Sequence, residues 1–194
     1  SALLDAQVTL PRMGGPSFSF SSRIVRAVFA VTWLLFAAWT PPQMRGWRRL
    51  LLQAFGARMG KGANVYSSVR IWHPAHLVMG DYATLGPRVN CYNQADITLG
   101  AYALVSQDAS LCAGSHDYED PEFQLRTRPI VLGAHSWIAA EAFVGPGVSI
   151  GDYAVLGARG VAMRNLEAGW IYSGNPAAAV KVRQYGAASV DPGV

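Results

Sequence analysis

A six-residue repeat runs from residue 59 to residue 166 and constrains what this chain can fold into. An aliphatic or small residue returns every six positions, Gly often follows it, and a small or β-branched residue stands four positions later. This spacing matches neither the 3.6-residue period of a helix nor the alternation of a simple strand. It fits short parallel strands joined by tight turns, so that three hexads form one triangular coil. The repeat positions are Met59, Val65, Ile71, Met79, Leu85, Cys91, Leu99, Val105, Leu111, Leu132, Ile138, Val144, Ile150 and Leu156.

Breaks in the repeat indicate where one coil ends and the next begins. Two-residue insertions follow the first two sets of three hexads, and residues 115–129 interrupt the pattern before it resumes in register. Since a corner accommodates extra residues easily, these breaks indicate coils that begin near residues 59, 79, 99, 132 and 150. We therefore predict a mainly β fold, a parallel β-helix of about five coils over residues 57–168, with a protruding loop at 117–130.

The two ends of the chain differ in composition from the repeat. Residues 1–22 are polar and predict a flexible N-terminal arm, and residues 23–56 predict an apolar helical extension in which Pro41 and Pro42 stop the first helix. Residues 24–39, with Arg26 among them, fall short of the roughly 20 apolar residues of a membrane-spanning helix. Residues 169–194 predict a C-terminal cap and tail with a short helix, in which residues 177–185 cover the last coil.

Two interpretations of the helical extension remain open. The helices either pack on the flank of the β-helix or a neighbouring subunit, or make a peripheral membrane contact through residues 24–55. In the second case the interfacial and cationic side chains that would meet the membrane are Trp33, Trp39, Trp47, Arg45, Arg48 and Arg49.

Composition narrows the classes of partner and the compartment. The net charge is +4, but no long basic stripe is interleaved with aromatic residues, which argues against nucleic acid as a partner. No cleavable signal peptide is evident, and the two cysteines are expected to be buried thiols. We expect a cytoplasmic protein, placed on the inner face of the cytoplasmic membrane if the extension contacts lipid.

Several motifs resemble the hexapeptide-repeat acyltransferases, above all the colanic-acid-biosynthesis acetyltransferase type, which is related to the maltose and galactoside O-acetyltransferases. The residues that carry the resemblance are Val105-Ser106-Gln107, Leu111-Cys112-Ala113-Gly114-Ser115-His116-Asp117, Pro129-Ile130-Val131-Leu132-Gly133, Trp137, Val144-Gly145-Pro146-Gly147-Val148 and Gly174-Asn175-Pro176-Ala177. The resemblance implies a left-handed β-helix, a homotrimer with active sites between neighbouring subunits, acetyl-CoA as donor and a sugar hydroxyl as acceptor.

The resemblance also assigns His116 as the general base. A sugar hydroxyl is a weak nucleophile at neutral pH, and a histidine base typically contributes about 10²–10⁴-fold to such a rate. Since no nucleophile of the protein is required, we expect direct transfer in a ternary complex. The family places an oxyanion donor in the turn after Trp137, and here that donor is the backbone N–H of Ala140. Asp117 is expected to orient His116 or the acceptor.

Donor and acceptor sites are assigned with less detail. For the donor, the resemblance implies that main-chain groups of Gly157 and Ala158 hold the pantetheine arm and that Trp137 packs near it. The cations expected at the CoA phosphates are Arg159, Arg164 and Lys181. The acceptor-binding candidates are Asn90, Tyr92, Asn93 and Asp117, and Arg126 or Arg128 would meet an anionic sugar or a diphosphate lipid.

The leading functional hypothesis is an O-acetyltransferase that acts on a sugar of a surface polysaccharide, at the lipid-linked stage. An N-acetyltransferase on an amino sugar and a transferase of longer acyl chains stay open, as does a non-catalytic trimeric scaffold. A metal-dependent lyase like the γ-type carbonic anhydrases would need three converging histidines. The chain has four, His73, His76, His116 and His135, without the spacing of that family, so we expect no metal.

Overall fold

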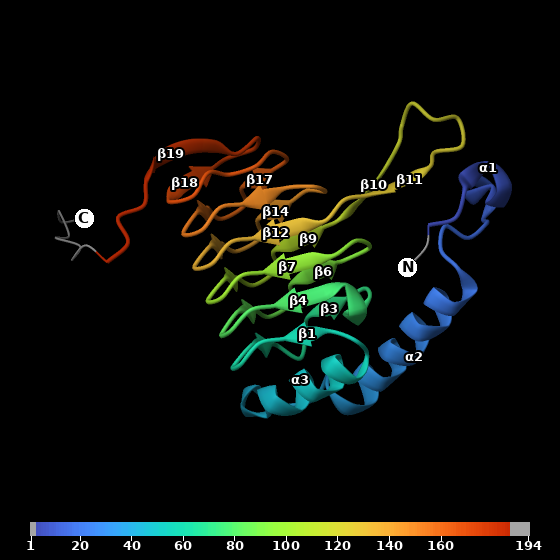
Figure 1. Cartoon of the computed structure of the whole chain (residues 1–194), viewed down its shortest axis with the longest axis horizontal. Coiled ribbons are helices and arrows are strands. Elements are labelled where there is room, and N and C mark those ends of the chain that lie inside the picture. Colours follow the sequence, from blue (N-terminus) through green and yellow to red (C-terminus); the bar gives the residue numbers. More distant parts are fainter. Residues whose placement is uncertain (1–2, 187–194) are drawn as a thin grey trace.

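The computed structural model describes residues 3–186, and the chain winds into stacked coils with three sheets as their sides, parallel except for the last strand of the second (Figure 1). The first sheet contains β1 (Arg58–Met59), β4 (Leu77–Met79), β7 (Ile97–Leu99), β12 (Ile130–Leu132) and β15 (Ser149–Ile150). The second contains β2 (Asn64–Val65), β5 (Thr84–Leu85), β8 (Leu104–Val105), β13 (Trp137–Ile138), β16 (Val155–Leu156), β18 (Trp170–Ser173) and β19 (Ala178–Val182). The third contains β3 (Arg70–Ile71), β6 (Asn90–Tyr92), β9 (Ser110–Cys112), β14 (Phe143–Val144) and β17 (Val161–Ala162).

The strand register follows the hexads. Along the first sheet, Met59 pairs with Met79, Met79 with Leu99, Leu99 with Leu132, and Leu132 with Ile150. The pairing of β7 with β12 spans the interruption, so the coils continue in register beneath the protruding loop. The predicted left-handed β-helix and its coils are confirmed, and β18 adds a strand above the fifth coil.

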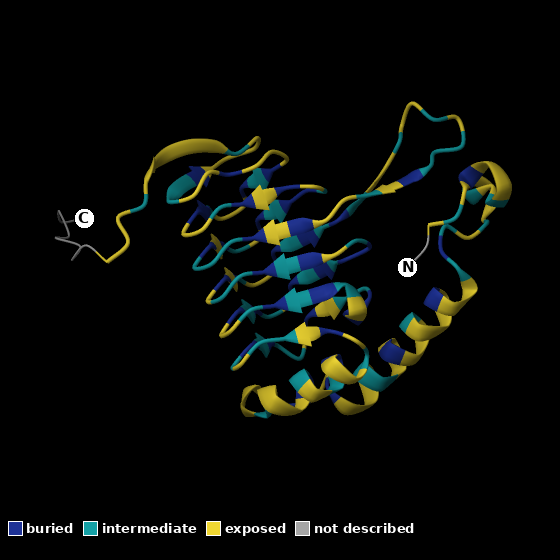
Figure 2. Cartoon of the chain, in the orientation of Figure 1, coloured by how far each residue is buried: buried dark blue, intermediate teal, exposed yellow. Residues whose placement is uncertain are grey.

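The core is the column of side chains that point into the coils. Hexad positions such as Leu85, Val105, Leu111 and Ile138 are fully buried, and the exposed residues in Figure 2 lie mainly at the corners, the hairpin and the helices. Burying one such column on all three sides stabilises the coils through the hydrophobic effect, since no single coil could exclude water alone. Cys91 lies in this core as expected. Cys112 follows the inward-pointing Leu111 on β9 and is only half-buried.

A ladder of aromatic rings runs along the corner between the first and second sheets. The rings of Tyr82, Tyr102, His135 and Tyr153 stack in order, with centroid separations of 5.1, 4.9 and 4.7 Å. All four residues have φ values of 56–60°, a left-handed conformation that the tight corner requires. Each stacked pair adds about 0.5–1.5 kcal/mol beyond burial, which offsets part of the backbone strain at these corners.

The C-terminal segment corrects one expectation. The predicted short C-terminal helix is wrong, because residues 178–182 form β19, which pairs antiparallel with β18. The alanine and valine residues of this segment meet an available strand edge, and the ladder satisfies their backbone groups better than an isolated short helix would. The remainder of the predicted tail, residues 187–194, lies outside the described residues.

The N-terminal arm is folded rather than flexible over residues 3–22. It contains α1 (Ala6–Thr9) and η1 (Pro11–Met13), and Leu3 forms a β-bridge with Phe18. The arm lies against the hairpin of β10 (Gly114–His116) and β11 (Leu125–Thr127), where Gln124 Oε1 accepts from Ala6 N at 2.7 Å and Gln124 Nε2 donates to Leu4 O (Figure 1). A polar segment gains structure here because a distant side chain satisfies its backbone.

The helical extension packs beneath the first coil. It consists of α2 (Phe20–Phe36), η2 (Pro42–Met44) and α3 (Arg45–Ala54), while a further short turn, η3 (Pro74–His76), lies between β3 and β4. Phe29 and Leu52 join the core, and Trp33 Nε1 donates to Ser67 O at 3.1 Å. The flank-packing interpretation is therefore confirmed for one side of these helices. Among residues 3–186, no helix combines the length and apolarity needed to cross a membrane.

Arg48 has a structural role. It is 1% exposed; Nε donates to Val65 O at 2.7 Å and Nη1 donates to Thr40 Oγ1 at 2.9 Å, while Pro41 and Pro42 also provide carbonyl acceptors. The expectation that Arg48 meets lipid headgroups is wrong, because its guanidinium joins the turn between α2 and α3 to β2. Trp33, which packs inward, is likewise not an interfacial residue.

Candidate active site around His116

The β10–β11 hairpin holds His116 in a defined orientation. His116 Nδ1 lies 2.9 Å from the carbonyl oxygen of Phe123, and the two rings stack with centroids 4.4 Å apart. Because a carbonyl can only accept, we assign the proton to Nδ1, which leaves the lone pair on Nε2. His116 is therefore held in the tautomer that a general base needs, with the unprotonated nitrogen on the side away from the carbonyl.

Asp117 is engaged by Arg126 rather than by His116. Its Oδ2 accepts from Arg126 Nη2 at 3.0 Å, and its Oδ1 accepts from Glu119 N. The hydrogen bond from Arg126 lowers the pKa of Asp117, so this carboxylate is ionised at neutral pH. The Phe123 carbonyl, not Asp117, contacts the His116 ring, so orienting the acceptor is the alternative that stays open for Asp117.

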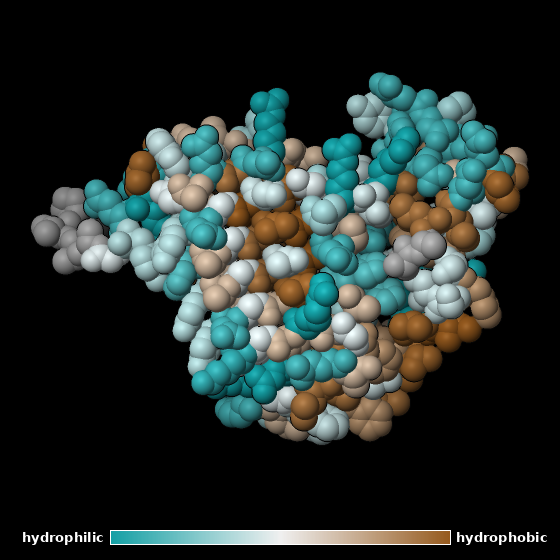
Figure 3. Space-filling model, viewed as in Figure 1, coloured by the Kyte–Doolittle hydropathy of each residue, from teal (hydrophilic) through white to brown (hydrophobic). Residues whose placement is uncertain are grey.

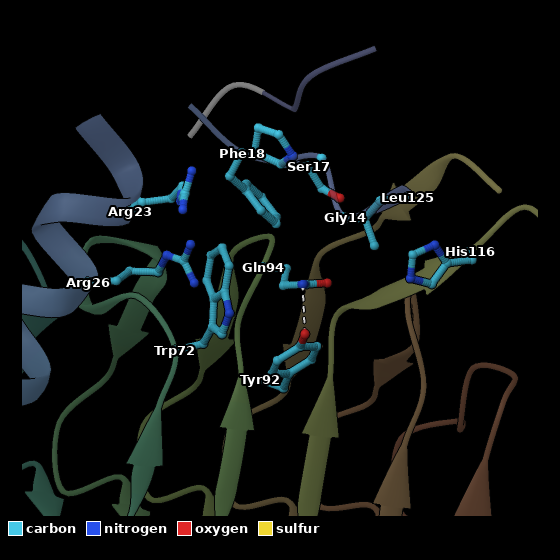
Figure 4. Close-up of a pocket in the computed structure, with 12 residues that line it drawn as sticks. Gly14, Ser17, Phe18, Arg23, Arg26, Trp72, Tyr92, Gln94, His116 and Leu125 are labelled. Atoms are coloured by element: carbon cyan, nitrogen blue, oxygen red, sulfur yellow. Dashed lines mark hydrogen bonds between the residues drawn. The ribbon is translucent and has the colours of Figure 1, made fainter. Parts of the chain in front are cut away.

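His116 borders two cavities. One, of about 420 Å³, lies between α2, the N-terminal arm and the third-sheet corner (Figure 4). The other, of about 580 Å³, lies on the opposite side of the hairpin, where Asp117, Arg126 and Arg128 face Pro146 and Met163. Substrates could thus approach His116 from two sides, as a transfer between two bound molecules requires.

Tyr92 lines the first cavity, as expected of an acceptor-binding residue. Gln94 Nε2 donates to Tyr92 Oη at 2.9 Å, and the Tyr92 ring meets the edge of Trp72 (Figure 4). Burial raises the pKa of Tyr92, so its hydroxyl is neutral at physiological pH and can donate or accept. Trp72 and Gln94 complete this wall of the cavity.

Asn93 is the acceptor candidate that the structure removes. It is fully buried; its Oδ1 accepts from Trp72 N and His73 N, and its Nδ2 donates to His73 O at 2.7 Å. These hydrogen bonds join the turn at Asn93 to the turn at His73. Because both polar atoms of the amide are buried and already bonded, Asn93 is not available to bind a sugar. Asn90 is half-buried on β6, donates to Ser110 Oγ and does not line the His116 cavities.

The expected oxyanion donor lies at the corner between the second and third sheets. Ala140 O accepts from Arg159 N at 2.9 Å, while its N–H has no hydrogen-bond acceptor within residues 3–186. Gly157 differs, since its N–H already donates to Tyr172 O at 2.7 Å and its carbonyl accepts from Gly160 N. Ala158 is exposed in the same turn. Of these backbone groups, the Ala140 N–H is therefore an available donor.

The three cations expected at CoA occupy different surroundings. Arg159 forms a two-contact ion pair with Glu141, and this hydrogen bonding raises the Arg159 pKa. Arg164 is exposed beside Asn165 and Pro176 in a cavity of about 480 Å³, and Lys181 is exposed on β19. Arg164 and Lys181 have no salt bridge to a described residue, whereas Arg159 is already compensated.

Trp137 lies apart from His116. It projects from β13 on the second sheet, its Nε1 donates to Ser106 Oγ at 2.9 Å, and it lines a cavity of about 590 Å³ with Tyr102, His135 and Arg183. His116 lines neither this cavity nor the one beside Arg164. Within one chain, Trp137 therefore lies away from the predicted base, whereas the cavity beside Arg164 adjoins the second His116 cavity at Met163.

Sequence reasoning missed several residues that surround His116. Arg23, Trp72 and Gln94 line the first cavity, and Phe123 fixes the His116 ring. Arg26 carried a signal, since it is a charge inside an apolar run, but only the packing of α2 beside the third-sheet corner gives that charge a place. Phe123 offered no sequence signal, because its backbone carbonyl makes the contact.

The part of the chain that the structure describes contains no cluster of side chains suited to bind a metal ion. No group of three or more His, Cys, Asp or Glu side chains within residues 3–186 could hold an ion. His73 and His76 stack at 4.6 Å, while His116 and His135 lie in separate cavities. The histidines thus do not converge as the lyase alternative would require.

Comparison with known proteins agrees with the architecture, although no family model matches the chain. The putative colanic acid biosynthesis acetyltransferase WcaF of Escherichia coli K12 is 42% identical over 159 residues, which cover 82% of this chain and 87% of the relative. The galactoside O-acetyltransferase of the same organism is 21% identical over 69% of this chain and 68% of its own length.

Solved structures share the fold at lower identity. A maltose O-acetyltransferase from Clostridium difficile 630 superposes with a TM-score of 0.76 at 20% identity, covering 86% of this chain and 90% of its own. A galactoside acetyltransferase in complex with coenzyme A gives a TM-score of 0.73 at 18% identity, covering 92% and 91%. By its fold and its extended identity to the Escherichia coli relative, this chain belongs to the hexapeptide-repeat acetyltransferases, in the group of the colanic acid biosynthesis acetyltransferases.

Proposed function

We propose that this protein transfers an acetyl group from acetyl-CoA to a sugar hydroxyl in surface polysaccharide biosynthesis, with His116 as general base. The observation that carries the proposal is the His116 ring, fixed by the Phe123 carbonyl at Nδ1 and bordering two cavities. Two solved relatives support the donor, a galactoside acetyltransferase bound to coenzyme A and a hexapeptide-repeat acetyltransferase from Vibrio cholerae complexed with acetyl coenzyme A.

The proposed chemistry is one direct transfer. His116 Nε2 takes the proton of the acceptor hydroxyl as its oxygen attacks the thioester carbonyl. The tetrahedral intermediate places its negative charge at the N–H of Ala140, a donor that costs no reorganisation. When the C–S bond breaks, the imidazolium returns the proton to the CoA sulfur, so the products are the acetylated sugar and free CoA.

The proposed assembly is a homotrimer whose active sites lie between subunits. Trp137 and the turn at Ala140 are separated from His116 within one chain, because they leave the coil at different corners. A neighbouring chain would bring its Trp137, Ala140, Gly157 and Ala158 to the cavity at His116. Arg164 and Lys181 would then face the CoA phosphates, with Arg159 available if it exchanges Glu141 for phosphate.

Replacing the base tests the mechanism. We expect His116→Ala to reduce acceptor-dependent release of CoA thiol by about 10²-fold or more. His76→Ala is the matched control, since His76 lies in η3 and lines neither the His116 cavities nor the Trp137 cavity. Retention of full activity by His116→Ala would exclude this mechanism.

The outer side of α2 suggests where the protein works. Apolar residues that are 47–73% exposed form a stripe along this side of α2, and Figure 3 shows hydrophobic side chains over this helix. They are Phe20, Ile24, Val28, Val31, Leu34 and Leu35. We propose that this stripe, with Trp39 and Trp47, contacts an anionic membrane surface, because residues 20–56 contain five arginines and no aspartate or glutamate.

Vesicle flotation tests the membrane contact. We expect the protein to float with vesicles that contain anionic lipid, and Leu34→Glu with Leu35→Glu to abolish flotation because two charges enter the apolar stripe. Val180→Glu with Val182→Glu on exposed β19 is the matched control. Equal flotation of the α2 variant and the wild type would contradict the proposal.

A further inference from the structure

The cavity between α2 and His116 is cationic. Arg23 and Arg26, one helical turn apart, line it together with Trp72 and Tyr92 (Figure 4). No aspartate or glutamate lines this cavity, and neither arginine belongs to a salt bridge within residues 3–186. Two like charges are thus held near each other without a counter-ion among the described residues, which favours an anionic ligand.

Aromatic rings, rather than hydrogen bonds, hold Arg26. Its guanidinium carbon lies 4.1 Å from the Trp72 ring centroid and 5.6 Å from that of Phe18. Within the described part of the chain, the Arg26 guanidinium donates to no side chain or carbonyl, and its buried Nε has no partner. A guanidinium stacked on rings is oriented while its N–H edge stays available, which suits recognition of an oxyanion.

The cavity spans the distance from these cations to the base. At about 420 Å³ it lies within the usual range for small-molecule sites, and His116 and Leu125 form its other end. A sugar with a phosphate at one end and a hydroxyl at the other could contact the arginines and His116 together. Two adjacent guanidiniums match the multiple oxygens of a phosphate better than they match a neutral sugar.

We propose that Arg23 and Arg26 bind a phosphate group of the acceptor, so that the substrate is a phosphate-linked or diphosphate-linked sugar. This inference rests on the proposed function and makes it more specific, since it assigns the acceptor's charge and names two residues for it. The phosphate could belong to a sugar phosphate, a nucleotide sugar or a lipid diphosphate, which share this chemistry.

Equilibrium binding by calorimetry tests the site. The probe is glucose 1-phosphate against glucose, with saturating CoA present so that the CoA phosphate contacts are filled. We expect glucose 1-phosphate to bind the wild type, and Arg23→Gln and Arg26→Gln each to weaken it about tenfold or more, since each removes a charge-assisted contact. Arg26→Lys, which keeps the charge, should retain part of the affinity.

Matched variants separate a phosphate site from a general charge effect. Lys61→Gln and Arg58→Gln each remove one positive charge outside the cavity and should bind glucose 1-phosphate as the wild type does. Equal binding of glucose and glucose 1-phosphate, or unchanged binding by Arg23→Gln and Arg26→Gln together, would overturn the inference. A purely packing role for Arg26 would leave Arg23→Gln without effect, and that result also counts against the phosphate site.

Two further arms identify the source of the phosphate and keep the two proposals distinct. We compare glucose 1-phosphate with a nucleoside diphosphate glucose and with a polyisoprenyl diphosphate glucose in detergent micelles. The compound that binds most tightly identifies which class of phosphate the acceptor carries. His116→Ala should keep the preference for glucose 1-phosphate over glucose, because the arginines that contact the phosphate are unchanged. If His116→Ala loses transfer while the arginine variants bind glucose 1-phosphate normally, the proposed function stands and this inference fails. If binding of glucose 1-phosphate depends on the arginines while His116→Ala stays active, the phosphate site stands and the proposed role of His116 fails.

Discussion

At the residue scale, His116 acquires its orientation without a carboxylate partner. The Phe123 carbonyl accepts from Nδ1, and the Phe123 ring covers one face of the imidazole. A neutral partner does not stabilise the imidazolium as a carboxylate would, so the ring remains free to give up its proton late in the transfer. Phe123 itself has φ of 55°, a conformation that the hairpin tip imposes and that points its carbonyl at His116.

Removing the Phe123 ring should slow the reaction without weakening donor binding. In Phe123→Ala the carbonyl stays but the stacking is lost, so we expect kcat to fall about tenfold, a part of what the base contributes. The KM for acetyl-CoA should not change, because Phe123 lines neither the cavity at Trp137 nor the one at Arg164. Steady-state kinetics measure both constants, with Phe20→Ala as the control; an unchanged kcat would show that the ring does not position His116.

His73 makes stability depend on pH. Burial, followed by the neighbouring charge of His76, lowers its pKa from 6.5 to about 4. Between pH 6.5 and pH 4, His73 binds a proton in the unfolded chain but not in the folded chain. The contribution of His73 to the free energy of unfolding is therefore highest above pH 6.5 and decreases as the pH falls towards 4. One such group contributes at most about 1.4 kcal/mol per pH unit.

Replacing His73 should therefore flatten this dependence. We expect the free energy of unfolding of the wild type to drop more between pH 7 and pH 5 than that of His73→Gln, although the variant is less stable at pH 7. Urea titrations at one protein concentration measure this difference, and the other titrating groups cancel between the two proteins. Parallel pH profiles would contradict the prediction.

At the element scale, the N-terminal arm and the hairpin hold each other. Gln124 donates to Leu4 O and accepts from Ala6 N, while Arg12 lies over the Phe123 ring with its guanidinium carbon 5.3 Å from the centroid. The arm thus forms one wall of the proposed acceptor cavity and touches the residue that orients His116. Two segments more than a hundred residues apart in sequence stabilise one site.

Gln124→Ala should release the arm from the hairpin. The variant loses both Gln124 contacts to the arm, and the backbone N–H of Ala6 loses its acceptor, so we expect faster amide exchange over residues 4–10. The rest of the β-helix should exchange as in the wild type. Hydrogen exchange with mass spectrometry checks this, with Gln107→Ala, at the corner between the second and third sheets, as the control. Equal protection of the arm in both variants would refute its dependence on Gln124.

At the scale of the whole molecule, the coils place the proposed base and most of the proposed donor residues on different corners; Arg164, which follows β17, shares the third-sheet corner with His116. His116 leaves the corner after the third sheet, while Trp137 stands on the second sheet. The stack of coils cannot bend to close that gap, because the inner strands of each sheet are paired with the coils above and below them. In the proposed mechanism, a second copy of the chain would therefore supply the Trp137 side of the site.

Mixed assemblies test the shared site. His116→Ala and Trp137→Ala should each be impaired alone, but their co-expression should restore about a quarter of wild-type sites, since random pairing in a ring joins an intact base to an intact donor side that often. Activity of purified, differently tagged mixtures measures the recovery, and sedimentation gives the subunit number. Mixtures no more active than the single variants would exclude a site shared between chains.

Much of the architecture was predictable because its causes are local. Each hexad carries its own inward residue and corner residue, so the pairing of Leu99 with Leu132 could be predicted across the interruption. Residues whose roles come from distant contacts were not predictable. From the sequence, Asn93 is expected to be a polar turn residue, but it is buried and donates to the His73 carbonyl. Arg48 is expected to be a surface cation, but it donates to the Val65 carbonyl.

The sequence by itself determined the coils, their register and the loop that carries His116, because a six-residue period specifies which side chains point inward whatever lies elsewhere. Only the tertiary structure decided what surrounds that histidine. Packing of α2 beside the third-sheet corner brings Arg23 and Arg26 to the same cavity, and the hairpin turns the Phe123 carbonyl towards Nδ1. These contacts join segments that no local pattern relates, so their geometry follows from how the chain packs.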